Sequence, residues 1–325
     1  MKANRTSLNL LAAVSVLIGS APALATDRVN VAYFLEWATP NQIAKVERAF
    51  DDAMGVEVTW TNFGNGGAMT EAMLAGDIDI AYSQGLTPFA NAVNASAPIK
   101  MVGIAVAYGA ADDCIVRDDT GIGKRNAAEL EGRTVAVPLN TMADFGFRMT
   151  LQTLGVDVNA VTIVDQDPAD AAVSLVDGSV VMACGFGENS LAAMRDVGQP
   201  LLTAEEKAAA GITSFDIISV TESFLQDNPD LVRTFLEVTH EANAAFAADD
   251  SNIDVIAADA GMTVERTRTQ MAGFAFPSVE DQLDDYFSDN GLALSMLSFM
   301  GKMFATEQHP ALDDYSVTID TGYLR

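Results

Sequence analysis

The stretch TVAVPLNTMADFGFRMTLQTL, residues 134–154, indicates the fold class of this chain. Its first four residues are β-branched or small and apolar, which is typical of a short buried strand. Asn140 and Thr141 follow, and apolar residues then recur at helical spacing, so we expect a helix over residues 142–154. A strand that leads through a short loop into a helix is the repeating unit of α/β proteins.

The same alternation of strand and helix patterns continues on both sides of this stretch. We expect further strands at residues 29–34, 56–63, 78–82, 99–106, 161–164, 180–184 and 215–220. Helices are expected from residue 39 onward and at residues 68–75, 88–94, 169–176 and 190–197. After the strand at 215–220 the chain becomes almost wholly helical, with helices expected at 231–247, 264–272, 279–286 and 294–304.

This order predicts two α/β units, each with a mainly parallel sheet flanked by helices, then a return strand and a helical tail. We place the boundaries at residues 112–113 and 213–214. Lobe one would then comprise residues 26–113 and 214–325, and lobe two residues 114–213. Two crossings between two lobes form a hinge, and a hinge leaves a cleft in which a ligand can bind.

The N-terminus has the layout of a secretory signal peptide over residues 1–25. Lys2 and Arg5 are followed by an apolar run at residues 8–18, which is too short to span a bilayer, and then by a small-residue cleavage site ending at Ala25. We therefore expect a mature chain that begins near Thr26 and works outside the cytoplasm. The alternative is an N-terminal amphipathic helix of the folded domain.

The net charge of −27 disfavours binding to nucleic acid or to anionic lipid. Cys114 and Cys184 are the two cysteines, and in an oxidising compartment they either form a disulfide or remain as two buried thiols. The two histidines, His240 and His309, do not cluster with the cysteines, so we expect no metal site and no cofactor.

Several motifs carry a resemblance to a known family. They are VAYF at 31–34, AGDIDI at 75–80 before SQG at 83–85, LEGRTVAVP at 130–138, Asp177-Gly178, and Phe215-Asp216. On an exported two-lobed chain, these motifs resemble the solute-binding proteins of ATP-driven importers, in the taurine (alkanesulfonate) and nitrate-type branch. The stretch FLEWATP, residues 34–40, is similar to taurine-importer binding proteins in particular.

The resemblance covers essentially the whole mature chain and implies a type II periplasmic binding protein. It implies a periplasmic location, a small zwitterionic ligand such as taurine, and a cognate ABC permease as partner. Contact with the membrane would occur only through that permease, and no contact with nucleic acid is implied.

Ligands of open α/β sheets bind beyond the carboxyl ends of the strands, so we looked for binding groups there. Small residues ahead of helices, such as Asn140 and Thr141, can offer backbone N–H groups to a sulfonate, helped by the helix dipole. The hydroxyl groups of Ser83 and Thr141 would add donors. The alternative is that these residues are ordinary turn and helix-cap residues.

A second set of residues is acidic and aromatic. Glu36 and Asp216 are expected to face the cleft beside Trp37 and Phe186, and together they suit an ammonium group. The resemblance implies that Asp216 is the amine partner. The expected ligand-binding residues are Glu36, Trp37, Ser83, Gln84, Asn140, Thr141, Phe186 and Asp216.

Two alternatives remain open at this point. Arg148 is the only arginine near the expected cleft, so two acids with aromatic walls would also suit a quaternary ammonium or another small amine, such as choline or glycine betaine. A receptor could also replace the permease as the partner.

The sequence favours a non-catalytic protein. It contains no G-x-S-x-G, H-E-x-x-H or P-loop motif, and Cys184 has no histidine nearby in sequence. It also lacks the cysteine-rich motif of pyrimidine-synthesising enzymes of similar fold.

Overall fold

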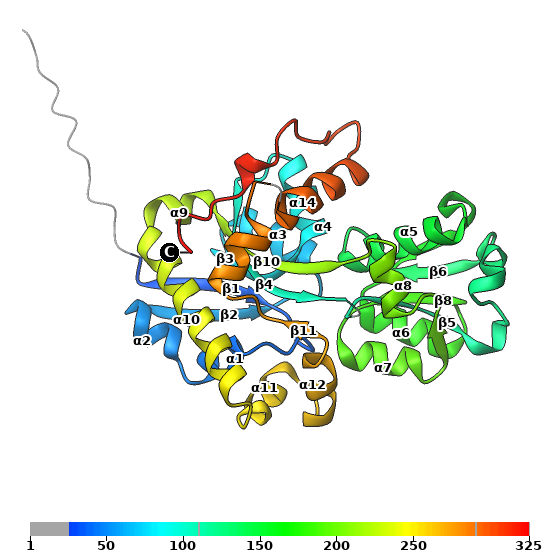
Figure 1. The fold of residues 1–325 in the computed structure, drawn as a ribbon, viewed down its shortest axis with the longest axis horizontal. Coiled ribbons are helices and arrows are strands. Elements are labelled where there is room, and N and C mark those ends of the chain that lie inside the picture. The colour runs from blue at the N-terminus through cyan, green and yellow to red at the C-terminus, as the bar shows by residue number, and fades with distance from the viewer. Residues whose placement is uncertain (1–25, 110, 290, 325) are drawn as a thin grey trace, which may run out of the picture.

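The computed structural model describes residues 26–109, 111–289 and 291–324. The expected signal peptide, residues 1–25, therefore lies outside the described residues. Two separate sheets form two bodies that lie side by side in Figure 1, with the second body drawn in green. Below we call these bodies the first and the second lobe.

The first lobe contains a six-stranded sheet in the order β11-β4-β10-β3-β1-β2. Its strands are β1 (Arg28–Tyr33), β2 (Glu57–Asn62), β3 (Ile80–Gly85), β4 (Ile99–Tyr108), β10 (Ser214–Thr221) and β11 (Phe274–Ala275). Strand β1 is parallel to β2 and β3, whereas β10 is antiparallel to β3 and β4. The start of β10 pairs with the end of β4, Ser214 opposite Tyr108, so the two crossings between the lobes run side by side.

Helices cover both faces of this sheet because alternate strand residues point to opposite sides. Val31 packs in the hydrophobic cluster that contains Phe50 and Phe235, while its neighbour Ala32 packs in the cluster that contains Phe89 and Leu297. The helices of this lobe are α1 (Asn41–Val46), α2 (Ala49–Met54), α3 (Gly66–Ala75), α4 (Leu86–Asn94), α9 (Glu222–Asp227), α10 (Pro229–Ala248), α11 (Ile253–Ala260), α12 (Val264–Met271), α13 (Val279–Asp281) and α14 (Leu292–Met303).

The second lobe contains a five-stranded sheet in the order β7-β6-β8-β5-β9. Its strands are β5 (Asp113–Arg117), β6 (Thr134–Val137), β7 (Thr162–Asp165), β8 (Met182–Gly185) and β9 (Gly198–Pro200). Its helices are α5 (Met142–Leu154), α6 (Pro168–Asp177), α7 (Glu188–Arg195) and α8 (Ala204–Ala209). Strand β6 is parallel to β7 and β8, and β5 is antiparallel to β8 and β9.

The predicted α/β class with two lobes is confirmed, although each sheet is mixed rather than mainly parallel. The antiparallel pairs come from the return strand β10 and from β5, β9 and β11, which the sequence analysis did not identify. The helix expected from residue 39 onward is divided into α1 and α2, because Arg48 between them adopts a left-handed conformation with φ of 60°. Within the described ranges, no helix has both the length and the apolar character needed to cross a membrane.

Candidate functional site

A small cavity of about 30 Å³ lies between the two lobes. The first lobe contributes Phe34, Trp37, Gly66, Gly85, Pro88, Tyr108 and Asp216, the second contributes Thr141, Met142 and Phe186, and Asp112 lies at the crossing between them. Residues of both lobes are needed to enclose it. None of these residues is a lysine or an arginine, so the charged side chains of the cavity are both carboxylates.

Asp216 forms the acidic end of the cavity from strand β10 and is only 3% exposed. Its carboxylate accepts hydrogen bonds from the Tyr108 hydroxyl at 2.8 Å and from Ser83 Oγ at 2.9 Å. Burial, together with the neighbouring Asp112 carboxylate, raises the pKa of Asp216 well above its ordinary value. A cationic ligand group would supply the positive charge that the protein does not place there.

Trp37 is held against this acidic end by a short chain of hydrogen bonds. Its Nε1–H donates to Ser83 Oγ at 2.8 Å, and Ser83 in turn donates to Asp216. The ring also meets the edge of Tyr108 at a centroid distance of 5.1 Å. The Ser83 hydroxyl donates its only proton to Asp216, so it is not a free donor for an anion. Ser83 instead positions the side chains of Trp37 and Asp216.

Gln84 lies outside the cavity and is fully buried. Its amide donates to Thr70 Oγ1 at 2.7 Å, and its carbonyl accepts from Ser219 Oγ at 2.6 Å. These contacts join α3 to strands β3 and β10, so the structure gives Gln84 a role in packing and does not bring it to the other predicted site residues.

The starts of three helices also line the cavity, and one of them, at Gly85, pairs directly with Asp216 in the sheet. Gly66 is the first residue of α3, Gly85 is the N-cap of α4, and Thr141 is the N-cap of α5. The first N–H groups of a helix have no acceptor within the helix and favour a negative charge. A Cβ atom on Gly66 would lie 2.5 Å from Pro88 Cγ, so only glycine allows α3 and α4 to approach this closely.

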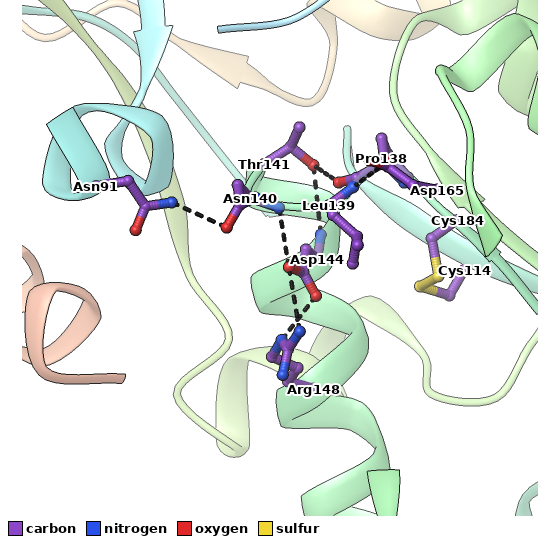
Figure 2. Close-up of polar contacts among 10 residues, drawn as sticks. All are labelled: Asn91, Cys114, Pro138, Leu139, Asn140, Thr141, Asp144, Arg148, Asp165 and Cys184. Carbon is purple, nitrogen blue, oxygen red and sulfur yellow. Dashed lines mark hydrogen bonds and ion pairs between the residues drawn. A yellow bond between two sulfur atoms is a disulfide. The ribbon is translucent and has the colours of Figure 1, made fainter. Parts of the chain in front are cut away.

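Only part of the predicted Asn140–Thr141 pair faces the cavity. Figure 2 shows that the Asn140 N–H already donates to Asp144 Oδ2, at 2.9 Å, and that the Asn140 side chain accepts from Asn91 of the first lobe at 3.2 Å. Thr141 Oγ1 donates to the Pro138 carbonyl at 2.7 Å and caps α5, so its hydroxyl is occupied as well. What this pair can offer an anion is the backbone at the start of α5.

Arg148 does not enter the cavity. Its Nε donates to Asp144 Oδ1 at 2.7 Å, and its side chain is 34% exposed (Figure 2). Asp144 therefore links Arg148 to the turn at Asn140 and neutralises the Arg148 charge. No guanidinium group of a described residue lines the cavity.

Glu36 is not among the residues that line the cavity. A positive φ of 57° turns the chain at Glu36, and the carboxylate lies at the start of α7 in the second lobe, where Oε2 accepts from the Ser190 N–H at 3.4 Å. A Cβ atom on Gly187 would lie 3.0 Å from Glu36 Oε2, so glycine at that position permits the contact. Glu36 thus joins the lobes at the cavity rim instead of lying beside Asp216.

The sequence analysis missed several residues of the cavity, above all Asp112 and Tyr108. It treated Asp112 as a lobe boundary, although that position also follows the carboxyl end of a strand, which is the signal that identified the other candidates. Phe186 lies where expected, with its ring 5.9 Å from that of Phe34 across the two lobes. Met142 follows the same strand as Asn140 and Thr141 but was not chosen as a ligand-binding residue, and Pro88 had no such signal because it is an apolar residue in a helix.

Cys114 and Cys184 form a disulfide with an S–S distance of 2.02 Å. They lie directly opposite each other on the antiparallel strands β5 and β8, within the core of the second lobe. Among the residues that the structure describes, no group of three or more histidine, cysteine or acidic side chains could hold a metal ion.

The comparisons with known proteins agree with this architecture. Residues 41–253, more than half of the chain, match the NMT1/THI5-like family. The taurine-binding periplasmic protein of Escherichia coli (strain K12) is 26% identical over 244 residues, which cover 74% of this chain and 72% of that protein.

Two solved structures illustrate the range of this fold. The alkanesulfonate-binding protein SsuA from Xanthomonas axonopodis pv. citri, bound to MOPS, superposes with a TM-score of 0.70 at 16% identity, covering 92% of this chain and 99% of that one. The desulfurization enzyme DSZB has a TM-score of 0.63 at 15% identity, covering 92% of this chain and 98% of the enzyme. The fold therefore occurs both in binding proteins and in an enzyme. The Escherichia coli relative, at 26% identity, is a binding protein. The chain belongs to the NMT1/THI5-like family, and the resemblance to solute-binding proteins of the taurine and alkanesulfonate branch is confirmed by its homology to a taurine-binding periplasmic protein.

Proposed function

We propose that this protein is an extracytoplasmic solute-binding protein that captures taurine, or a related small aminosulfonate, and delivers it to an ABC permease. The observation that carries the proposal is the cavity between the lobes, which is lined both by a buried carboxylate and by three helix N-termini. A zwitterion with an ammonium and a sulfonate two carbons apart matches that polarity. The taurine-binding relative supports the same ligand class.

Capture would occur by closure of two lobes, residues 26–113 with 214–325 on one side and residues 114–213 on the other. The ammonium would lie against Asp216 and the faces of Trp37 and Phe186, and the sulfonate against the starts of α3, α4 and α5. The ligand would stabilise the closed state only through contacts that the open state lacks. We further propose a periplasmic location, with a signal peptide cleaved near Ala25, and no catalytic activity.

A second candidate ligand is a quaternary ammonium compound such as choline or glycine betaine. Two carboxylates, aromatic walls and the lack of any lysine or arginine along the cavity favour this alternative. The two candidates differ in the group that occupies the helix N-termini, which is a sulfonate in taurine.

The test is calorimetric titration of the refolded, ligand-stripped mature protein with taurine, choline and glycine betaine. Taurine should bind, and Asp216→Asn should weaken its binding by about 2–4 kcal/mol, because the ammonium then lacks its buried partner. Asp227→Asn is the matched control, since it removes the same charge from an exposed position at the end of α9. Binding of the quaternary amines alone, or unchanged taurine affinity in Asp216→Asn, would contradict the proposal.

A further inference from the structure

Asp112 is a second carboxylate in the cavity, and the function proposed above does not use it. It lies between β4 and β5, where the chain first crosses from one lobe to the other. It lines the cavity together with Asp216, and its Oδ2 atom is buried without a hydrogen-bond partner. A buried carboxylate oxygen without a donor is costly, so the arrangement calls for a group that the protein does not provide.

The neighbouring donors are already committed to other acceptors. The Tyr108 hydroxyl lies close to both carboxylates, but its single proton goes to Asp216 at 2.8 Å. Lys207 is the nearby cation, and its ammonium donates to the Asp113 carboxylate and to the Asp112 backbone oxygen. Among the described residues, the Oδ2 atom of Asp112 therefore has no hydrogen-bond donor.

We propose that Asp112 is a second anchor for the ligand's ammonium group, and that binding of the ligand expels one proton that Asp112 and Asp216 share in the empty cavity. This inference rests on the function proposed above. The ammonium keeps its own protons and donates to both carboxylates, while the expelled proton leaves for the solvent. The carboxylate pair together with its cation carries one net negative charge before and after binding, since the ammonium replaces the proton. The sulfonate adds a second negative charge, which the helix N-termini would stabilise.

The charges around the pair support such sharing. Burial is the main cause that raises the pKa of Asp112, to about 7, and the Tyr108 hydroxyl and then the Lys207 charge oppose the shift. The titratable groups that face the pair are Tyr108 from β4, Asp113 from β5 and Lys207 from α8. Both carboxylates line the same cavity, and the Asp112 charge raises the pKa of Asp216, so we treat the proton as belonging to the pair and not to either residue.

The second anchor also bears on specificity. A primary ammonium has three N–H donors and can satisfy both Asp216 and the free oxygen of Asp112. A quaternary ammonium has none, so it would leave Asp112 Oδ2 buried without a donor. Asp112 therefore favours taurine over choline and glycine betaine.

The test counts protons in calorimetric titrations of the wild-type protein with taurine. Titrations in phosphate and in cacodylate differ in buffer ionisation enthalpy, and sulfonate buffers are avoided because they carry the proposed ligand's own group. Near pH 6, the number of protons released per taurine bound should approach one. Below about pH 7, taurine affinity should therefore fall by up to about tenfold for each unit of pH. This part needs no variant, so a folding defect cannot obscure it.

Asp112→Asn provides the second measurement. At a pH above 7, where the wild-type pair is largely ionised, the variant should bind taurine about 30-fold or more weakly, and it should release no proton. It should bind ethanesulfonate, which lacks the amine, at least as well as the wild type does. Asp227→Asn again serves as the control for loss of a charge.

The outcomes separate the two proposals. Tight taurine binding without proton release, or with unchanged affinity in Asp112→Asn, would overturn the role of Asp112 and leave the proposed function standing. Failure of the wild type to bind taurine at any pH would overturn the proposed function, and the role of Asp112 with it.

Discussion

Glu36 joins the two lobes, and we expect its removal to weaken ligand binding without any contact to the ligand. Its carboxylate lies at the start of α7, beside Gly187 and the Ser190 N–H, while its own backbone belongs to the first lobe. The contact joins residues of different lobes, so opening of the cleft would break it. Substitution Glu36→Gln keeps the size of the side chain and removes the charge.

The magnitude follows from the geometry. The hydrogen bond from Ser190 is long, at 3.4 Å, so most of the stabilisation comes from the charge at the positive end of the helix dipole. A partly exposed charge at a helix N-terminus contributes about 0.5–1 kcal/mol. Since this energy is present only in the closed state, taurine affinity should fall by about two- to fivefold.

Calorimetric titration of Glu36→Gln with taurine measures this effect, and Glu47→Gln at the exposed end of α1 is the control for loss of the same charge. A loss of about 30-fold or more would show that Glu36 contacts the ammonium directly, as the sequence analysis expected, because a direct ion pair contributes about 2 kcal/mol or more. Unchanged affinity would show that the contact with α7 does not contribute to closure.

Three further predictions concern the scaffold. The disulfide joins residues 70 positions apart, so its reduction should lower the free energy of unfolding of the second lobe by up to about 4 kcal/mol, measured by urea denaturation with and without reductant. Trp37 lines the cavity and Trp60 does not. Trp37→Phe should therefore abolish the change in tryptophan fluorescence on taurine binding. Loss of that change in Trp60→Phe would contradict this placement. Lys207→Met should lower the free energy of unfolding in urea by about 3 kcal/mol. The buried Asp113 carboxylate would then have only Arg195, at 4.0 Å, as a cationic neighbour. A smaller loss than that of an exposed lysine variant such as Lys302→Met would refute this prediction.

Much of the fold could be predicted from local pattern. The strand at 134–137 and the helix at 142–154 lie where the sequence placed them, and the long helix of the tail, expected at 231–247, is α10 (Pro229–Ala248). Strands β5, β9 and β11 were missed, although β6 is just as short and was predicted, so length alone does not explain the difference. These strands are held by pairing with neighbours that are distant in the chain, and a local pattern does not report such pairing.

The site was predicted less completely, for a related reason. Asp216 was assigned to the cavity from its motif on the return strand, and it lines the cavity. Glu36 was assigned to the same end because it follows a strand, but its positive φ turns the side chain towards α7. Gln84 was assigned to the loop after the strand expected at 78–82, but β3 continues to Gly85, and the Gln84 side chain bonds to Thr70 and Ser219.

Local sequence patterns were enough to predict the two α/β units, their order along the chain and the positions of the loops that could hold a ligand. These features depend on hydrophobic periodicity and helix caps within a few residues, so they can be read locally. Which side chains line the same cavity, and which hydroxyl groups donate to its carboxylates, follow from the tertiary structure alone. The hydrogen bond from Ser83 to Asp216 spans 133 positions, and Asp112 meets Asp216 only because the two crossings run side by side. Burial of both carboxylates in one cavity sets their charge, and burial is a property of the folded chain.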